Sequence, residues 1–328
     1  MAKRRLTQHQ KRNIHKKQKQ HIAVATQLDT PDNTPQQLGR VVANYGNSLI
    51  VDDGQKNWIP CTARRHLGSL LAGDTVSWQL SEGTDTPQGV VTAVVDRKSI
   101  LSRLNGFGQR KDVAANIDQL IIVTAPLPLI QPLLLDQYLV VAEQMGLRIQ
   151  IILNKTDLLS PDTTIESYLD YYANIGYAVH HTSITTQQGI EELDKILQHN
   201  TSIFSGQSGV GKSSLINQLI PDLALRTGQL SELSQLGQHT TSTTTLYPLH
   251  GNGYLIDSPG VRNFNTKADS LESISQGFRE FRPFLGQCRF HNCQHRTEPG
   301  CLIQQEVNAG RIAQHRLQHF HSMTENLR

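Results

Sequence analysis

One stretch of the chain has the composition of a loop that binds phosphate. Residues 206–213 are Gly-Gln-Ser-Gly-Val-Gly-Lys-Ser and match the pattern G-x-x-x-x-G-K-S. The glycines let backbone N–H groups turn toward phosphate oxygens, and the helix that follows adds its unpaired N–H groups and positive dipole end. We expect Lys212 to reach the β- and γ-phosphates and Ser213 to ligand Mg²⁺. The residues expected to contact the nucleotide are Gly206, Gln207, Ser208, Gly209, Val210, Gly211, Lys212, Ser213 and Ser214.

A tetrapeptide earlier in the chain indicates which base the nucleotide carries. Residues 154–157, Asn-Lys-Thr-Asp, directly follow a short apolar run. An aspartate carboxylate can accept two hydrogen bonds from guanine, one from N1–H and one from the exocyclic amino group. Adenine has neither donor at these positions and would leave an ionised Asp157 desolvated and unpaired. We therefore expect Asn154, Lys155 and Asp157 to form a guanine pocket, and Ser183 is a further candidate for a backbone contact to the base.

Two further segments complete a set of GTPase motifs. Residues 257–260 are Asp-Ser-Pro-Gly and follow a short apolar run. Asp257 could hold Mg²⁺ through water, and the Gly260 N–H could contact the γ-phosphate. Residues 237–245 are rich in threonine and lack apolar periodicity, so we expect an exposed segment in which one threonine ligands Mg²⁺ in the GTP state. The residue pattern does not decide which threonine this is.

The residue after the last motif bears on hydrolysis. Many GTPases place a glutamine directly after D-x-x-G, where it orients the attacking water. This chain has Val261 there, and a valine side chain cannot hydrogen-bond to water. We therefore expect slow turnover by the isolated chain, with another group or a partner positioning the water. His239, beside the threonine run, is the candidate by residue type.

The motifs occur in an unusual order. Ordinary small GTPases present the phosphate loop first, then the switch threonine, D-x-x-G and N-K-x-D, whereas here N-K-x-D comes first and D-x-x-G last. The same sheet can be built from a chain whose ends have been moved, because the motifs still meet at the carboxyl ends of its strands. The sequence therefore predicts a circularly permuted α/β P-loop GTPase domain.

Three of the four cysteines lie close together in the C-terminal region. With one histidine they have the spacing C-x₄-C-x-H-x₅-C, formed by Cys288, Cys293, His295 and Cys301. Three thiolates and an imidazole suit tetrahedral Zn²⁺ with no open position, which predicts one structural zinc ion. His291 is the alternative fourth ligand. Cys61 stands apart, and we expect it to be a small buried residue.

The elements that must position the nucleotide motifs alternate between strands and helices from residue 116 onward. Apolar runs predict strands at 117–124, 149–153, 178–182, 201–205 and 254–256. Apolar periodicity predicts helices near 135–145, 165–173, 190–197 and 214–219. This alternation predicts an α/β domain with a mostly parallel sheet.

Before residue 104 the chain instead alternates short strands with turns. Strands are predicted at 41–45, 49–51, 58–61, 75–80 and 90–95. Such a succession of short strands suggests a small β-barrel such as an OB-fold, although an SH3-like barrel would give the same pattern.

Charge is distributed unevenly along the 328 residues. The formal net charge is +3, yet eight Lys and Arg residues precede the first acidic residue, Asp29. Without them, 23 basic residues face 28 acidic ones, a net of −5. Such a basic run cannot bury enough apolar surface to fold alone. We expect a disordered arm that binds nucleic acid through counterion release.

Arginine is also in excess around the cysteine cluster. Between residues 277 and 321, six arginines face three glutamates, which favours a phosphate backbone as partner. They are Arg279, Arg282, Arg289, Arg296, Arg311 and Arg316 against Glu280, Glu298 and Glu306.

Membrane insertion and secretion are not indicated. The most apolar stretch, 120–135, is interrupted by prolines, and the charged N-terminus has no apolar signal segment. We expect a cytoplasmic protein.

In combination, these motifs closely resemble the RsgA family, bacterial GTPases that depend on the small ribosomal subunit. The resemblance rests on N-K-T-D, G-Q-S-G-V-G-K-S, G-Q-H-T-T and D-S-P-G-V in that order, with the cysteine-rich tail, and covers nearly the whole chain. It implies an OB-fold, a permuted GTPase domain and a small zinc-binding α-rich domain. It also implies GTP hydrolysis stimulated by the small subunit, in the late maturation of that subunit. Finally, it implies Thr241 as the switch threonine and strengthens His239 as the residue that positions water.

The expected organisation is then a basic arm at 1–35, an OB-fold at 36–104, the permuted GTPase domain at 105–270 and the zinc-binding domain at 271–328. The expected partners are GTP and GDP, and the 30S subunit with its rRNA, bound by a monomer. One rival is a P-loop ATPase or kinase, against which N-K-x-D argues. A second is an RNA-binding module with a vestigial nucleotide site, against which the intact Lys212, Ser213 and Asp257 argue.

Overall fold

The structure is a computed structural model, and it describes residues 36–46, 48–55, 57–81, 88–104, 109–161, 164–234, 244–257 and 270–325. The predicted basic arm lies outside the described residues, as do His239, Thr241 and Gly260. The chain divides into two compact units. One comprises 1–102, 111–117 and 221–260, and the other comprises 103–110, 118–220 and 261–328. The domain boundaries expected from the sequence stay a prediction.

The first unit contains a closed barrel. Its strands are β1 (Gln37–Asn44), β2 (Leu49–Asp52), β3 (Trp58–Ala63), β4 (Thr75–Leu80) and β5 (Gly89–Val94). They close in the order β1-β2-β3-β5-β4, and only the β3–β5 pair is parallel. Alternate residues such as Val41, Val76 and Trp78 fill the interior. The five-stranded order is OB-like, which confirms the predicted fold class over the SH3-like alternative.

The same unit includes elements that the sequence analysis did not predict. They are β6 (Ile100–Leu104), β7 (Arg110–Ala115), α6 (Leu223–Ser234) and β12 (Thr245–Pro248), which pairs antiparallel with β13 (Tyr254–Asp257). Aromatic contacts attach this hairpin to the barrel. The rings of Trp58 and Tyr247 lie 6.4 Å apart, and the Arg40 guanidinium lies 5.0 Å from the Tyr254 ring. The Arg226 guanidinium of α6 also lies 5.9 Å from the Trp58 ring, so the elements on both sides of residues 235–243 pack against the barrel.

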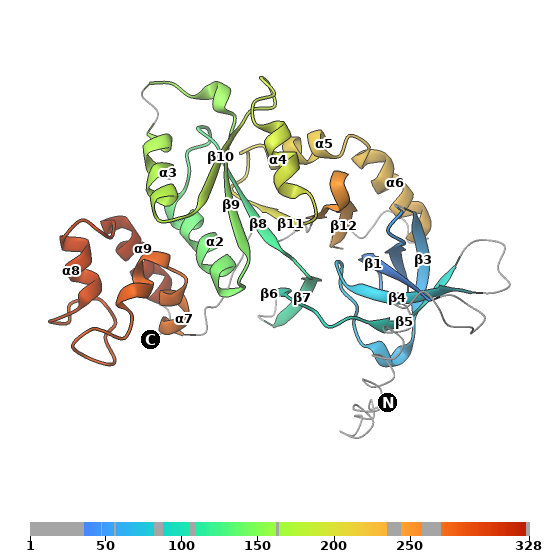
Figure 1. Cartoon of the computed structure of the whole chain (residues 1–328), viewed down its shortest axis with the longest axis horizontal. Helices are drawn as coiled ribbons and strands as arrows, with labels where there is room; N and C mark the ends of the chain where they lie inside the picture. Colours follow the sequence, from blue (N-terminus) through green and yellow to red (C-terminus); the bar gives the residue numbers. More distant parts are fainter. Residues whose placement is uncertain are drawn as a thin grey trace. The chain divides into compact units, whose positions relative to one another are not determined.

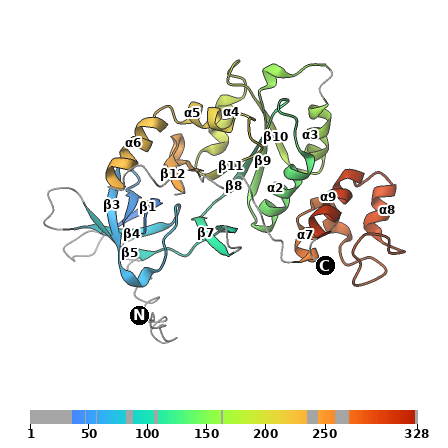
Figure 2. The same ribbon diagram turned by 180° about the vertical axis from the view of Figure 1, so that it is seen from behind.

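The second unit contains four parallel strands in the order β10-β9-β8-β11. They are β8 (Gln119–Thr124), β9 (Arg148–Asn154), β10 (Ala178–Thr182) and β11 (Thr201–Ser205). Helices α2 (Pro132–Gln144), α3 (Ile165–Asn174), α4 (Ile190–Leu197) and α5 (Lys212–Leu219) flank the strands on both sides (Figures 1 and 2). Every residue of β8 and β11 is buried, as expected of central parallel strands.

The C-terminal elements of this unit share a core with α2. They are α7 (Leu271–Gln276), η4 (Arg279–Phe284), α8 (Leu302–Asn308) and α9 (Gln314–Thr324). Phe278, Phe281 and Phe320 are fully buried and pack in one cluster with Val140 of α2. The cysteine-rich region is therefore anchored on α2. No helix among the described residues has the length and apolarity to cross a membrane.

A buried ion-pair network reinforces this anchorage. Arg316 of α9 has no exposed surface, and its guanidinium pairs with Asp136 of α2 and with Glu280, at 2.6 Å from Nε to Oε1. The Tyr172 hydroxyl of α3 donates to the Asp136 carboxylate at 2.7 Å. One arginine thus links α9 to two carboxylates from separate parts of the chain.

Replacing this arginine should destabilise the chain strongly. Arg316→Met keeps the side-chain length but leaves two buried carboxylates without their cation, which costs about 3–5 kcal/mol in the free energy of unfolding. Chemical denaturation followed by α-helical circular dichroism measures the loss. The matched control is Lys195→Met, since Lys195 and its partner Glu191 are both exposed on α4, where little change is expected. Equal effects of the two variants would contradict the role of the network.

Candidate functional site

The predicted nucleotide motifs follow neighbouring parallel strands. The guanine loop, residues 154–157, lies at the end of β9, and the phosphate loop, residues 206–213, follows β11. The strand between them is β8. Because the carboxyl ends of adjacent parallel strands meet at one edge of a sheet, both loops emerge at the same edge. The order of the motifs along the chain does not affect this placement.

The phosphate loop is shaped by close approach of its backbone to β8. Gly206 has φ +136°, and a Cβ there would lie 2.2 Å from the carbonyl oxygen of Val123. Helix α5 begins at Lys212, so its first N–H groups face the loop. The Lys212 Nζ donates to the carbonyl oxygens of Gly206 at 2.6 Å and Gln207 at 2.5 Å. The ammonium group therefore lies across the loop, while Ser208, Gly209, Ser213 and Ser214 are exposed.

Asn154 joins the guanine loop to the phosphate loop. Its side chain is buried, and its Nδ2 donates to the carbonyl oxygen of Val210 at 2.9 Å. Its Oδ1 accepts from the Thr182 hydroxyl at 3.1 Å. The approach is so close that a Cβ on Gly211 would lie 2.4 Å from the Asn154 Nδ2. Asn154 thus sets the spacing between the two loops, a more direct role than the supporting one expected from the sequence.

Lys155 provides a second link between the loops. The residue has a left-handed backbone with φ 60°, and its Nζ donates to the carbonyl oxygens of Gly209 at 2.6 Å and Leu127 at 3.2 Å. Leu127 belongs to the segment that follows β8, so Lys155 connects three segments at this edge of the sheet.

The Asp157 carboxylate is exposed, so its oxygens can accept hydrogen bonds from a ligand. The Ser183 hydroxyl donates to its Oδ1 at 2.5 Å, and this bond lowers the pKa of Asp157. The carboxylate is therefore ionised at neutral pH, as guanine recognition requires. Ser183 was expected to offer a backbone contact to the base, whereas in the structure its hydroxyl contacts Asp157. The side-chain contacts of Thr182 with Asn154 and of Gln188 with Thr156 were not predicted.

The two loops open onto one cavity of about 260 Å³. It is lined by Lys155 of the guanine loop together with Ser208, Gly209, Gly211, Lys212, Ser213 and Ser214. Lys155 is the guanine-loop residue in this lining, and with Asn154 it places the guanine loop directly beside the phosphate loop. Asp257 lies in the other unit, exposed at the end of β13, and its backbone pairs with Thr245. Its contact with Mg²⁺ stays a prediction, as do the roles of His239, Thr241 and Gly260.

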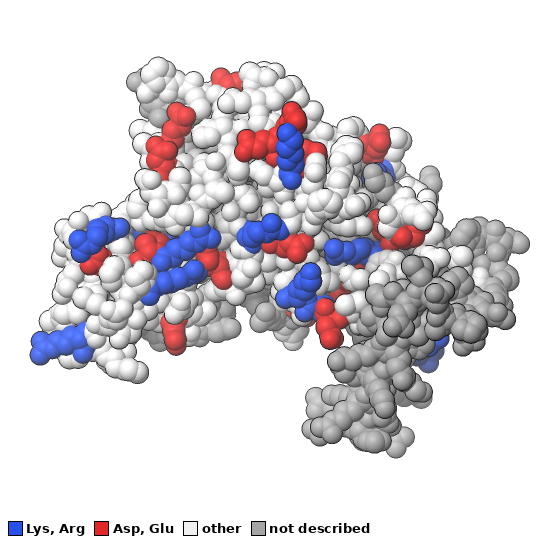
Figure 3. Space-filling model, in the orientation of Figure 1, with Lys and Arg blue, Asp and Glu red and all other residues white. Residues whose placement is uncertain are grey.

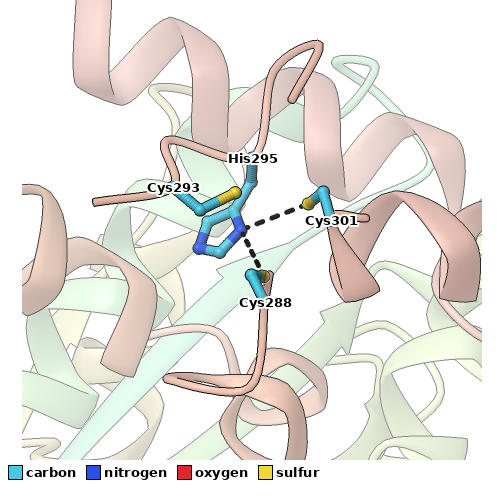
Figure 4. Close-up of side chains that lie close together, drawn as sticks. All are labelled: Cys288, Cys293, His295 and Cys301. Atoms are coloured by element: carbon cyan, nitrogen blue, oxygen red, sulfur yellow. Dashed lines mark hydrogen bonds between the residues drawn. The ribbon is translucent and has the colours of Figure 1, made fainter. Parts of the chain in front are cut away.

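The three clustered cysteines and one histidine form a second site. The ligand atoms of Cys288, Cys293, His295 and Cys301 all lie within 4.8 Å of one another. The His295 Nδ1 lies 3.6 Å from the Cys288 sulfur and 3.4 Å from the Cys301 sulfur, and the imidazole faces both (Figure 4). A tetrahedral Zn²⁺ site requires a nitrogen-to-sulfur separation of about 3.5 Å. His295, and not the exposed His291, completes the group.

The protonation of the cluster also fits a bound cation. Burial lowers the pKa of His295, which favours the neutral imidazole that ligates metals. Burial, with the neighbouring thiols, raises the pKa of Cys293 to about 12. Three thiolates at such short range therefore need a cation to offset their charge. The donor set and its spacing are those of a closed structural site.

Most of the arginines around the cluster are held in ion pairs. Arg279 and Arg282 both pair with Glu143 of α2, at 2.5 and 2.6 Å. Arg311 and Arg316 also pair with carboxylates. The local excess of positive charge counted from the sequence is thus largely neutralised. Counting charges between residues 277 and 321 does not reveal these pairs, because Glu143 and Asp136 lie far from that segment in the sequence.

Comparisons with known proteins cover almost all of the chain. The sequence model of the RsgA GTPase family matches residues 94–267. Two relatives are each 42% identical to this chain. Both are named "Small ribosomal subunit biogenesis GTPase RsgA", one from Actinobacillus pleuropneumoniae serotype 5b and one from Chromohalobacter salexigens. These alignments cover 99% and 100% of this chain and 96% and 99% of the relatives.

Solved structures show the same arrangement of elements. The crystal structure of YjeQ from Thermotoga maritima has a TM-score of 0.72 and 30% identity, covering 89% of this chain and 98% of that chain. The structure of YloQ, described as a circularly permuted GTPase, has a TM-score of 0.69 and 27% identity, covering 88% and 94%. The permuted topology predicted from the order of the motifs is therefore shared with solved structures.

Proposed function

The chain belongs to the RsgA GTPase family, and from this membership and the geometry of its nucleotide cavity we propose that it hydrolyses GTP to GDP during late maturation of the small (30S) ribosomal subunit. The observation that supports the proposal most directly is that Asn154 and Lys155 hold the guanine loop against the phosphate loop, beside the cavity that Lys155 and the phosphate loop line. An ATPase or a kinase would not need an ionised carboxylate at the base position. An RNA-binding module with a vestigial nucleotide site would not need Asn154 to hold the guanine loop at a fixed distance from the phosphate loop.

In the proposed complex, the guanine loop selects the base. The Asp157 carboxylate accepts hydrogen bonds from guanine N1–H and from the exocyclic amino group, while Ser183 holds it in place. The aliphatic part of Lys155 packs along the base. ATP is rejected because adenine would leave the Asp157 charge unpaired.

The phosphate loop binds the triphosphate. Its backbone N–H groups and the start of α5 surround the β-phosphate, and Lys212 exchanges its two carbonyl contacts for oxygens of the β- and γ-phosphates. Ser213, with Thr241 and Asp257, would hold Mg²⁺, which neutralises charge between the β- and γ-phosphates. Water then attacks the γ-phosphorus, and the bond to the β–γ bridging oxygen breaks to release GDP.

Stimulation by the small subunit follows from the missing glutamine. Val261 cannot orient the attacking water, and we assign that task to His239 once a bound subunit positions it. The basic arm at 1–35 would hold the subunit through its rRNA. We propose that one copy acts alone, in the cytoplasm, where ribosomal subunits mature.

The metal in the cysteine cluster is proposed to be a single structural Zn²⁺. Its four ligands come from the loop after η4 and the residue that precedes α8, so it would hold this loop against the helices that follow. With no position left for substrate, the ion contributes folding energy and no chemistry.

Loss of one ligand should remove the metal. Wild-type protein should contain one zinc per chain, and Cys301→Ser should contain almost none, with helices α8 and α9 becoming sensitive to protease. Elemental analysis and limited proteolysis measure both effects. Cys61→Ala is the control, because Cys61 is buried in the barrel and should not affect metal content. A Cys301→Ser variant that retained one zinc per chain, or a wild type that held iron, would contradict the assignment.

Turnover with and without small subunits tests the proposed function directly. Wild-type protein should hydrolyse GTP slowly alone and much faster with purified subunits. Lys212→Ala should lose about a hundredfold or more in subunit-stimulated turnover, since it removes a charge that stabilises the transition state. It should still bind subunits through the arm.

The matched control for this test is Lys195→Ala. Lys195 is an exposed lysine of α4 that pairs with Glu191, so the control makes the same change of charge outside the cavity. It should hydrolyse GTP at the wild-type rate. The proposed function fails if subunits leave wild-type turnover unchanged, or if Lys212→Ala hydrolyses GTP as fast as Lys195→Ala.

A further inference from the structure

The loop between the first two metal ligands presents an aromatic ring to solvent. Phe290 is 42% exposed, and among the described residues it is the one aromatic side chain in the group of exposed large apolar residues. Phe278, Phe281 and Phe320 of the same region are completely buried. Phe290 is therefore exposed because of its position in the loop, since the other phenylalanines named here are buried.

The backbone holds this ring in a fixed position. Cys288 and Cys293, both metal ligands, lie two and three residues away on either side of Phe290. The Cys293 N–H donates to the Phe290 carbonyl oxygen at 3.2 Å, and the Arg289 N–H donates to the Gly300 carbonyl oxygen at 3.1 Å. Gly300 has φ +78°, and a Cβ there would lie 2.8 Å from the Arg289 Cβ. A short loop fixed at both ends leaves the ring little freedom to fold back into the core.

A cation accompanies the ring. The Arg289 guanidinium carbon lies 5.5 Å from the centre of the Phe290 ring. No described carboxylate pairs with Arg289, unlike Arg279, Arg282, Arg311 and Arg316. The nearby Glu298 carboxylate accepts from the backbone N–H groups of Gln294, Arg296 and Thr297 instead. Figure 3 shows one basic side chain that projects at the lower left of these C-terminal elements with no acidic side chain directly beside it.

We propose that Phe290 and Arg289 form a stacking site for an unpaired base of single-stranded RNA. The ring offers a flat apolar face to the base, and the guanidinium offers charge to the adjacent phosphate. A protein partner would require a contiguous apolar patch, whereas here a single ring stands among polar residues. This inference rests on the proposed function only in that a ribosomal subunit would supply such RNA.

The site can be tested on the full-length protein with a single-stranded oligoadenylate and an RNA duplex of equal length. Phe290→Ala should bind the single strand at least about fivefold more weakly than wild type, since stacking of one base contributes about 1–3 kcal/mol. Binding of the duplex should not change. The difference should persist as salt is raised, because salt weakens the basic arm much more than stacking.

A second substitution gives a direct signal. Phe290→Trp keeps a stacking face, so it should retain single-strand binding, and its fluorescence should be quenched by the single strand and not by the duplex. The native Trp58 and Trp78 are buried at 6% and 2% exposure, so the new indole is the accessible one. Leu225→Ala, which removes an exposed apolar side chain from α6, is the control and should behave as wild type.

Metal content and turnover keep the outcomes distinct. If Phe290→Ala loses zinc, Phe290→Leu is used as the test variant in its place, because leucine keeps an apolar side chain without an aromatic face. Equal single-strand binding by a zinc-loaded variant and wild type overturns the inference. Reduced binding to subunits with unchanged binding to the single strand also overturns it and indicates a protein contact. GTP turnover by the isolated variant should match that of wild type. The stacking inference can therefore fail without affecting the test of the proposed function by Lys212→Ala.

Discussion

The hydrogen bond from the Asn154 side chain to the Val210 carbonyl oxygen sets the distance between the guanine loop and the phosphate loop. A guanine base and its phosphates are joined through one ribose, so a site that binds both must hold its two loops at a fixed separation. The buried amide does this, supported by the Thr182 hydroxyl on its other side and by the Lys155 ammonium beside it. Asn154 and Thr182 therefore determine, through the spacing of the two loops, whether one nucleotide can reach both of them.

Sheet geometry explains why permutation leaves this arrangement intact. The guanine loop and the phosphate loop follow β9 and β11, which lie on either side of β8, so their strands are about 10 Å apart whatever the chain order. What permutation does change is the set of elements attached to the sheet. The C-terminal elements pack on α2 and are held there by Arg316, Asp136 and Glu280.

The sequence predicted those features whose signal is local. The alternation of short strands with turns gave β4, and the alternation of strands and helices gave β10, α4 and β11, all with the bounds that the structure has. The spacing of cysteine and histidine gave the metal cluster. Helix α6 and strand β12 were missed, because α6 contains Gly228 and has little amphipathic pattern, while β12 is short and ends in a proline. Side-chain pairings across the chain could not be predicted. Glu143, the partner of Arg279, and Asp136, one partner of Arg316, each lie more than a hundred residues away in the sequence.

The most direct test of the account is the nucleotide preference of Asp157→Asn. This change replaces one carboxylate oxygen with an amide N–H₂ group, which opposes the amino group of guanine and complements the carbonyl of xanthine at the same position. Titration with GTP and with xanthosine triphosphate measures the preference. If Asp157 binds the base while the phosphate loop binds the same molecule, GTP affinity should fall by about tenfold or more and the xanthine nucleotide should become the tighter ligand. A variant that still bound GTP as tightly as wild type would contradict the single nucleotide cavity.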